Sequence, residues 1–115
     1  MTLDIATQKP ADRTAVIAVS GRLNAINVAE LRSAVASAVD EGWVRIVLEL
    51  RGVEFIDSSG LGGVISGLKC ARQAGGDLRL VAPTAQVMMI LHLTNLDQIL
   101  SVYPTIEAAC ADDVA

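Results

Sequence analysis

The stretch 53–63 combines an acid, two hydroxyls and several glycines between an apolar run and a helical pattern. Asp57, Ser58 and Ser59 stand where a strand is predicted to end and a helix to begin. Hydroxyls at a helix N-terminus lie beside unpaired backbone N–H groups and the positive end of the helix dipole, which favours a phosphate there. Asp57 would repel that phosphate. The combination predicts a site that is switched by phosphorylation.

Either hydroxyl could carry the phosphoryl group. On a helical wheel with about 100° per residue, Ser58 falls beside Lys69 on the polar side, whereas Ser59 falls between Ser66 and Cys70. The wheel therefore favours Ser58 as the more accessible hydroxyl. Serine and aspartate are also ordinary N-cap residues, so helix capping alone explains the same residues as well.

Enzymatic interpretations of this stretch lack residues that they require. Gly60-Leu61-Gly62 follows a predicted strand as in a dinucleotide-binding turn, but Ile65 takes the place of the third glycine. A hydrolase elbow would need a glycine at Ile56. The single histidine, His92, lies in an apolar helical pattern and is expected at the surface or half-buried. We expect no enzyme and no cofactor; a small-ligand site at the turn 60–63 is the weakest hypothesis.

The hydrophobic pattern predicts strands and helices that alternate along the chain. Strands are predicted over 3–7, 14–20 (closed by Gly21), 44–50 with 53–56 as a short continuation, 77–82 and 99–102. Helices are predicted from Asn27 to near Gly42, over 58–74, from Pro83 through Leu91, and from Pro104 through Ala109. Asn27, with Glu30 three residues later, matches an N-cap and its capping partner. The order indicates an α/β fold with an antiparallel first pair of strands and parallel crossovers after it.

The predicted helix 58–74 contains four glycines, each of which costs about 1 kcal/mol relative to alanine in a helix interior. Their sum, on the order of 2–4 kcal/mol, indicates that another backbone approaches closely. One stripe of this helix is small, and the neighbouring bulky stripe is expected to face the sheet. The small stripe consists of Gly60, Gly63, Gly67, Cys70, Ala71 and Ala74, and the bulky stripe of Leu61, Val64, Ile65 and Leu68. The small stripe either packs within the same domain or admits a partner.

The composition is that of a folded chain with an acidic balance. The 115 residues are 52% hydrophobic and 19% charged, which is enough for one domain with its own core. The net charge of −4 argues against binding nucleic acid or an anionic membrane through a basic surface. No signal peptide is visible, and the longest uncharged stretch, 80–96, is too short and too polar to span a bilayer. We therefore expect a cytoplasmic protein without membrane insertion.

The two cysteines, Cys70 and Cys110, lie far apart in the sequence. Neither has a histidine or a second cysteine at a spacing that is typical of metal ligands. We therefore expect no metal site and two buried, reduced thiols.

Five segments, taken in this order of strands and helices, resemble a known family. They are 16–24, 45–50, 55–62, 75–80 and 91–96, and the most specific of them carries Asp-Ser-Ser-Gly-Leu-Gly at 57–62. The chain resembles a STAS domain of the bacterial anti-sigma factor antagonist type. The resemblance implies that residues 1–115 form one such domain, with a mixed sheet of four to five strands and about four α-helices.

The resemblance implies a regulatory binding protein. Members of this family bind an anti-sigma factor that is also a serine kinase with a histidine-kinase-like ATPase fold, and thereby release a sigma factor. The kinase phosphorylates the serine directly after the aspartate, here Ser58, which separates the complex, and a serine phosphatase restores it. The implied partner-binding residues are Asn24, Asp57, Ser58, Ser59, Gly60, Leu61 and Gly62.

The resemblance departs at Gly21-Arg22-Leu23-Asn24, where many antagonists carry Gly-Glu-Leu-Asp. Asn24 keeps the capacity for hydrogen bonding but removes a charge, and Arg22 reverses one. An alternative function of the same fold is a scaffold that is never phosphorylated, as a subunit of a stress-signalling complex or of a lipid transport system.

Overall fold

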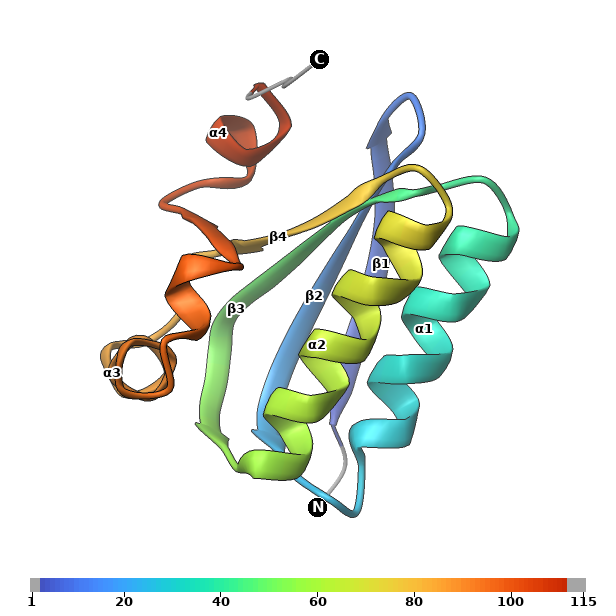
Figure 1. The fold of residues 1–115 in the computed structure, drawn as a ribbon. Coiled ribbons are helices and arrows are strands. Elements are labelled where there is room, and N and C mark those ends of the chain that lie inside the picture. The colour runs from blue at the N-terminus through green and yellow to red at the C-terminus, as the bar shows by residue number, and fades with distance from the viewer. Residues whose placement is uncertain (1–2, 112–115) are drawn as a thin grey trace.

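The computed structural model describes residues 3–111, and within them the chain forms one five-stranded sheet with four α-helices (Figure 1). The strands are β1 (Asp4–Ala11), β2 (Thr14–Leu23), β3 (Arg45–Ile56), β4 (Asp77–Val81) and β5 (Ser101–Tyr103). The helices are α1 (Val28–Asp40), α2 (Ser58–Gln73), α3 (Ala85–Leu93) and α4 (Ile106–Ala111), with a 3₁₀ turn η1 (Leu96–Gln98) before β5. The α/β class and the predicted order of elements are confirmed.

The strands lie in the sheet in the order in which they occur in the chain. β1 and β2 form an antiparallel hairpin, and β2, β3, β4 and β5 run parallel to one another. The carboxyl ends of the four parallel strands therefore lie at one edge of the sheet, and their amino ends at the opposite edge. Helices follow β2, β3 and β4 as crossovers, which is the usual way to join parallel strands.

Side chains of the central strand β3 alternate between two cores. Ile46 and Leu48 belong to the larger core, which also contains buried side chains of α1, α2 and α3. Val47 points to the opposite face and belongs to a smaller cluster with Val16, Val81 and Ala109 of α4. Figure 1 shows α1 and α2 side by side across the sheet, with α4 separated from them. Among the described residues, the sheet thus has one well-covered face and one face on which α4 is the only helix.

β2 is longer than the sequence predicts, because Gly21 does not end the strand, whereas the predicted continuation of 44–50 into 53–56 is confirmed in β3. Gly21 adopts a φ of 110° inside β2, and the pairing of β2 with β3 shifts register on both sides of Ser20. A Cβ atom at Gly52 would overlap the Ser20 hydroxyl, so the glycine allows the strands to stay paired there. The two strands consequently run on together to a last pair, Leu23 with Ile56. This bulge sets the position of the residues that follow both strands.

The two cysteines are less buried than the sequence predicts. Cys70 and Cys110 are free, as predicted, but they are half-buried rather than buried, because each lies at the margin of a packed helix face. Among the residues that the structure describes, no helix is long and apolar enough to cross a bilayer. The same residues include no group of three or more His, Cys, Asp or Glu side chains placed to hold a metal ion.

Candidate functional site

The turn between β3 and α2 is organised by Asp57. This residue has an extended backbone, and its carboxylate Oδ1 accepts a hydrogen bond of 2.9 Å from the N–H of Gly60. Its main-chain carbonyl accepts from the N–H of Leu61 at 2.9 Å, and its own N–H donates to the carbonyl of Leu23 at 3.2 Å. Asp57 is therefore the N-cap of α2 and ties the helix to the end of β2.

Ser58 and Ser59 are the first two residues of α2. Ser58 is exposed and Ser59 is half-buried, which confirms the ranking of their accessibility from the helical wheel. Within residues 3–111, neither hydroxyl forms a hydrogen bond with another residue, so the hypothesis that the serines serve as caps is wrong. Asp57 does the capping, because its extended backbone directs the carboxylate over the first turn. The Ser58 hydroxyl is left at the surface, at the positive end of the helix dipole.

Asn24 lies beside this turn, because it directly follows the β2 residue that pairs with Ile56. Its amide oxygen accepts hydrogen bonds from the N–H groups of Ile26 at 2.9 Å and Asn27 at 3.3 Å. Its main-chain carbonyl accepts from the N–H of Val28 at 2.9 Å. The side chain thus holds the loop between β2 and α1 in an Asx turn, which a carboxylate at this position would also form.

The side chain of Arg22, the second departure from the family pattern, contacts Phe55. It pairs with Phe55 across β2 and β3, and its guanidinium lies 4.5 Å from the centre of the Phe55 ring. This is a cation–π contact at the surface. The positive charge therefore lies over the end of β3, next to the turn that carries Ser58.

The predicted capping box at the start of α1 is wrong. Asn27 precedes α1 but its side chain makes no capping hydrogen bond. Instead, its amide oxygen accepts from the N–H of Asn24 at 2.9 Å and its amide nitrogen donates to the carbonyl of Arg22 at 2.6 Å. Asn27 is buried, and its hydrogen bonds hold the loop against β2. Its side chain therefore makes no hydrogen bond to the N–H groups of α1.

The glycines of α2 pack against the rest of the fold. A Cβ atom at Gly60 would lie 2.6 Å from the carbonyl oxygen of Leu23, and one at Gly63 would overlap Val28 of α1. Gly67 faces Leu78 and Val35 in the same way. The structure thus favours the first of the two alternatives for the small stripe, close packing within the chain.

The bulky stripe of α2 joins the larger core, as predicted. Val64 and Leu68 are buried, and Leu61 and Ile65 are half-buried against it. Of the predicted partner-binding residues on this helix, Gly60 is turned inward, while Leu61 and Gly62 keep part of their surface. The accessible part of the site is therefore the rim around Ser58 rather than the glycine stripe.

Apolar side chains beside the turn were not predicted from the sequence. Ile26, in the loop held by Asn24, is 89% exposed, and Phe55, two residues before Asp57, is 39% exposed. A shallow hollow of about 270 Å³ lies between the end of β3 and α3. Its lining residues are Phe55, Ile56, Gln86, Val87, Met89 and Ile90. Exposed apolar groups next to the Ser58 hydroxyl are a property of protein-docking surfaces.

Comparisons with known proteins agree with this geometry. The family model described as STAS domain matches residues 5–109. A protein of Thermotoga maritima named as an anti-sigma factor antagonist is 42% identical over 71 residues, which are 62% of this chain and 63% of that protein. The antagonist BtrV of Bordetella bronchiseptica is 30% identical over 105 residues, 91% of this chain and 90% of that protein. The alignments to the Thermotoga relatives thus span less than two thirds of their length.

A solved structure extends the similarity over most of the fold. The crystal structure of the Thermotoga maritima antagonist superposes with a TM-score of 0.84 at 34% identity, covering 92% of this chain and 91% of that one. An anti-sigma factor antagonist from Mycobacterium paratuberculosis has a TM-score of 0.83 at 26% identity, with coverages of 95% and 92%.

Proposed function

The chain belongs to the STAS domain family, and from this premise we propose that it is an anti-sigma factor antagonist that phosphorylation of Ser58 switches off. The observation that carries the proposal is the exposed Ser58 hydroxyl at the N-terminus of α2, beside the capping carboxylate of Asp57. The named relatives are antagonists of anti-sigma factors, which are regulatory rather than enzymatic proteins.

The proposed partner is an anti-sigma factor that is also a serine kinase with a histidine-kinase-like ATPase fold. Its docking surface comprises the rim of the β3–α2 turn and the exposed apolar groups around it. These residues are Asn24, Ile26, Phe55, Asp57, Ser58, Ser59, Gly60, Leu61 and Gly62. Because the hydroxyl lies within the proposed surface, the kinase would reach it only while docked or nearly docked.

Phosphorylation would act locally. A phosphoryl group adds about −1.5 to −2 units of charge in the middle of the proposed surface. The positive end of α2 tolerates this charge in the free protein. Docking would remove water from the phosphoryl group beside Asp57 and the apolar side chains of Ile26 and Phe55. The free energy of docking therefore becomes unfavourable while the fold is kept. A serine phosphatase would restore the binding state.

Phosphopeptide mapping tests the assignment. The protein is incubated with its cognate anti-sigma factor kinase and ATP, and the modified residue is identified by mass spectrometry. We expect the label on Ser58, with Ser66→Ala on the same helix as a control that leaves the labelling unchanged. Label on Ser59 alone, or no label with an active kinase, contradicts the proposal.

A constitutive scaffold is the second candidate, and one observation favours it. The positions of the two acids in the family pattern hold Asn24, whose amide oxygen is used in the loop, and Arg22, which stacks on Phe55. In such a scaffold, the same rim would dock a partner without being phosphorylated. A complex that co-purifies equally well with and without ATP would support the scaffold over the switch.

A further inference from the structure

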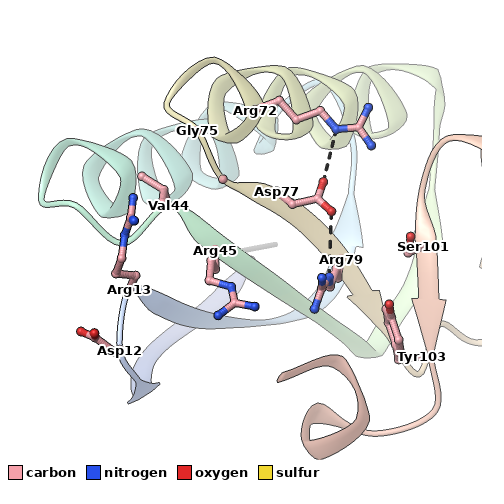
Figure 2. A pocket seen from close by; sticks show the side chains of 11 residues that line it. Asp12, Arg13, Val44, Arg45, Arg72, Gly75, Asp77, Arg79, Ser101 and Tyr103 are labelled. Atoms are coloured by element: carbon pink, nitrogen blue, oxygen red, sulfur yellow. Dashed lines mark hydrogen bonds and ion pairs between the residues drawn. The ribbon is translucent and has the colours of Figure 1, made fainter. Parts of the chain in front are cut away.

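A cavity of about 670 Å³ lies at the opposite edge of the sheet from Ser58. Four of the seven arginines of the chain line it (Figure 2). They come from four places in the fold: Arg13 from the β1–β2 hairpin, Arg45 from the start of β3, Arg72 from the end of α2, and Arg79 from β4. Arginines as far apart in the sequence as positions 13 and 79 thus line one concave surface.

Register explains why these side chains converge. Arg45 pairs with Asp77 across β3 and β4, and Val47 pairs with Arg79. Arg45 and Arg79 are therefore diagonal neighbours on the same face of the sheet, the face that α1 and α2 leave uncovered. Figure 2 shows both guanidinium groups projecting from neighbouring strands toward the same space. Arg13 lines the same cavity from the hairpin turn, where it has a φ of 59° and its carbonyl accepts from the N–H of Arg45 at 2.9 Å.

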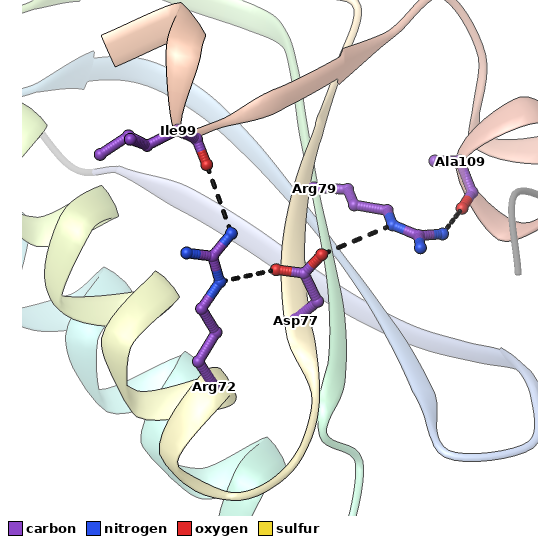
Figure 3. A network of polar contacts seen from close by, with 5 residues as sticks. All are labelled: Arg72, Asp77, Arg79, Ile99 and Ala109. Carbon is purple, nitrogen blue, oxygen red and sulfur yellow. Dashed lines mark hydrogen bonds and ion pairs between the residues drawn. The ribbon is translucent and has the colours of Figure 1, made fainter. Parts of the chain in front are cut away.

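Part of this charge has a structural role. Asp77 bridges two arginines, with Oδ1 at 3.3 Å from the Nε of Arg72 and Oδ2 at 3.9 Å from the Nε of Arg79 (Figure 3). Arg72 also donates to the carbonyl of Ile99 at 3.5 Å, and Arg79 to that of Ala109 at 2.6 Å. These contacts attach the segments around β5 and α4 to the sheet.

The structural role does not use all of the positive charge. Among the described residues, the lining of the cavity holds four guanidinium groups and the carboxylates of Asp12 and Asp77. The side chain of Arg79 is only 11% exposed, so the repulsion from its neighbours is screened less than at an open surface. Among residues 3–111, the side chain of Arg13 forms no ion pair. In a chain with a net charge of −4, four arginines in one cavity are a local feature.

We propose that this arginine cavity binds a small anion that carries two or more phosphate or carboxylate groups. Guanidinium groups bind both kinds of oxyanion through paired N–H donors, and the planar fork keeps its charge at any physiological pH. The volume is within the range of small-molecule sites. Tyr103, which lies against Arg79 with 5.7 Å between the guanidinium and the ring centre, provides a wall for the uncharged part of the ligand. The site does not depend on the proposed switch at Ser58.

Isothermal titration calorimetry with inorganic pyrophosphate tests the proposal, with citrate as a parallel carboxylate probe and orthophosphate as a single-group reference. We expect one saturable site per chain for pyrophosphate or citrate, with orthophosphate about tenfold weaker because it engages fewer guanidinium groups. The tighter of the two probes identifies the group that the cavity prefers. The absence of saturable binding of both probes overturns the proposal.

Matched variants locate the site. Arg13→Gln and Arg45→Gln are each expected to weaken binding of the preferred probe about tenfold. Arg51→Gln removes the same charge from an exposed position in the middle of β3, outside the cavity lining, and is expected to change the affinity less than about twofold. Arg13 lies in an exposed turn, so its variant is expected to keep the thermal stability of the parent. Equal weakening by Arg51→Gln, or unchanged affinity in both cavity variants, contradicts the assignment.

Discussion

The two edges of the sheet are organised by different means. At the carboxyl edge, the surroundings of Ser58 are built from backbone hydrogen bonds to Asp57, Asn24 and Asn27, with few charges. At the amino edge, the cavity is built from long charged side chains that come from four separate elements. The turn presents one hydroxyl at a fixed place, whereas the four arginines of the cavity provide an electrostatic field. The first arrangement suits a docking switch, and the second suits a diffusible anion.

The comparison also separates local charge from the charge of the whole chain. The net charge of −4 is the basis for expecting no basic surface that binds nucleic acid. The cavity gathers four arginines in a chain that is acidic as a whole, because most of the acidic residues lie elsewhere. Total charge therefore describes long-range attraction, and the arrangement of the strands decides where an anion meets a positive surface.

The largest effect is expected for a charge introduced at Ser58. In Ser58→Asp, a carboxylate occupies the proposed docking surface beside Asp57, and binding to the anti-sigma factor is expected to weaken about 100-fold, or about 2.8 kcal/mol. Ser58→Ala removes only an exposed hydroxyl and is expected to bind within about threefold of the parent. Surface plasmon resonance measures both. Equal affinities of the two variants would contradict the proposal that the carboxyl edge carries a switch.

Next in size is a pair of glycine substitutions in α2 that tests how the carboxyl edge is built. Gly60→Ala is expected to lower the free energy of unfolding by about 2 kcal/mol, because the new methyl group would lie 2.6 Å from the Leu23 carbonyl oxygen and 2.8 Å from Ile56. In Gly62→Ala, the new methyl group would make only an ordinary contact of 3.9 Å with the guanidinium of Arg32, so the substitution is expected to raise the free energy of unfolding by about 0.5–1 kcal/mol through helix propensity. Urea denaturation separates them. A stabilising Gly60→Ala would show that the helix does not pack this closely on β2.

A smaller loss of stability is expected at the helix cap. Asp57→Ala removes the acceptor for the Gly60 N–H and is expected to lower the free energy of unfolding by about 1 kcal/mol. Asp57→Asn keeps an acceptor oxygen and is expected to recover most of that loss. Thermal denaturation followed by circular dichroism gives the values. If both variants are as stable as the parent, the Asp57 cap does not fix the turn at the carboxyl edge of the sheet.

The smallest effect is expected at Asn24. Asn24→Asp keeps the oxygen that accepts from Ile26 and Asn27, so the free energy of unfolding should change by less than about 0.5 kcal/mol. Asn24→Ala loses both hydrogen bonds and should cost about 1 kcal/mol. Chemical denaturation of the two variants provides the comparison. A loss in Asn24→Asp as large as in Asn24→Ala would mean that the loop depends on the amide nitrogen instead.

Much of the fold and part of the site could be predicted because their signals are local. Apolar periodicity places the strands and helices, and the run Asp57-Ser58-Ser59 places a polar turn between β3 and α2. Local composition did not predict that Asn27 bonds backward to Arg22 rather than forward to α1, because the same amide can serve either purpose. The exposure of Phe55 follows from the register shift next to Gly21, which changes the alternation of inward and outward side chains.

The arginine cavity could not be predicted from the sequence for a different reason. Arg13, Arg45, Arg72 and Arg79 share no motif or spacing. The first three stand at or next to the end of an element, and Arg79 lies within β4. Only the parallel order of β2, β3 and β4 brings their amino ends to one edge. The cavity can therefore be recognised only once the strand pairing is known, whereas the Asp57-Ser58-Ser59 turn can be recognised from consecutive residues.

The central claim, that a phosphoryl group on Ser58 ends docking, is tested most directly by one measurement. The affinity of the anti-sigma factor is determined for the protein before and after treatment with the kinase and ATP, for the parent and for Ser58→Ala. The account predicts that treatment weakens binding of the parent about 100-fold and leaves Ser58→Ala unchanged. An equal loss of affinity in both proteins, or no loss in the fully phosphorylated parent, would contradict it.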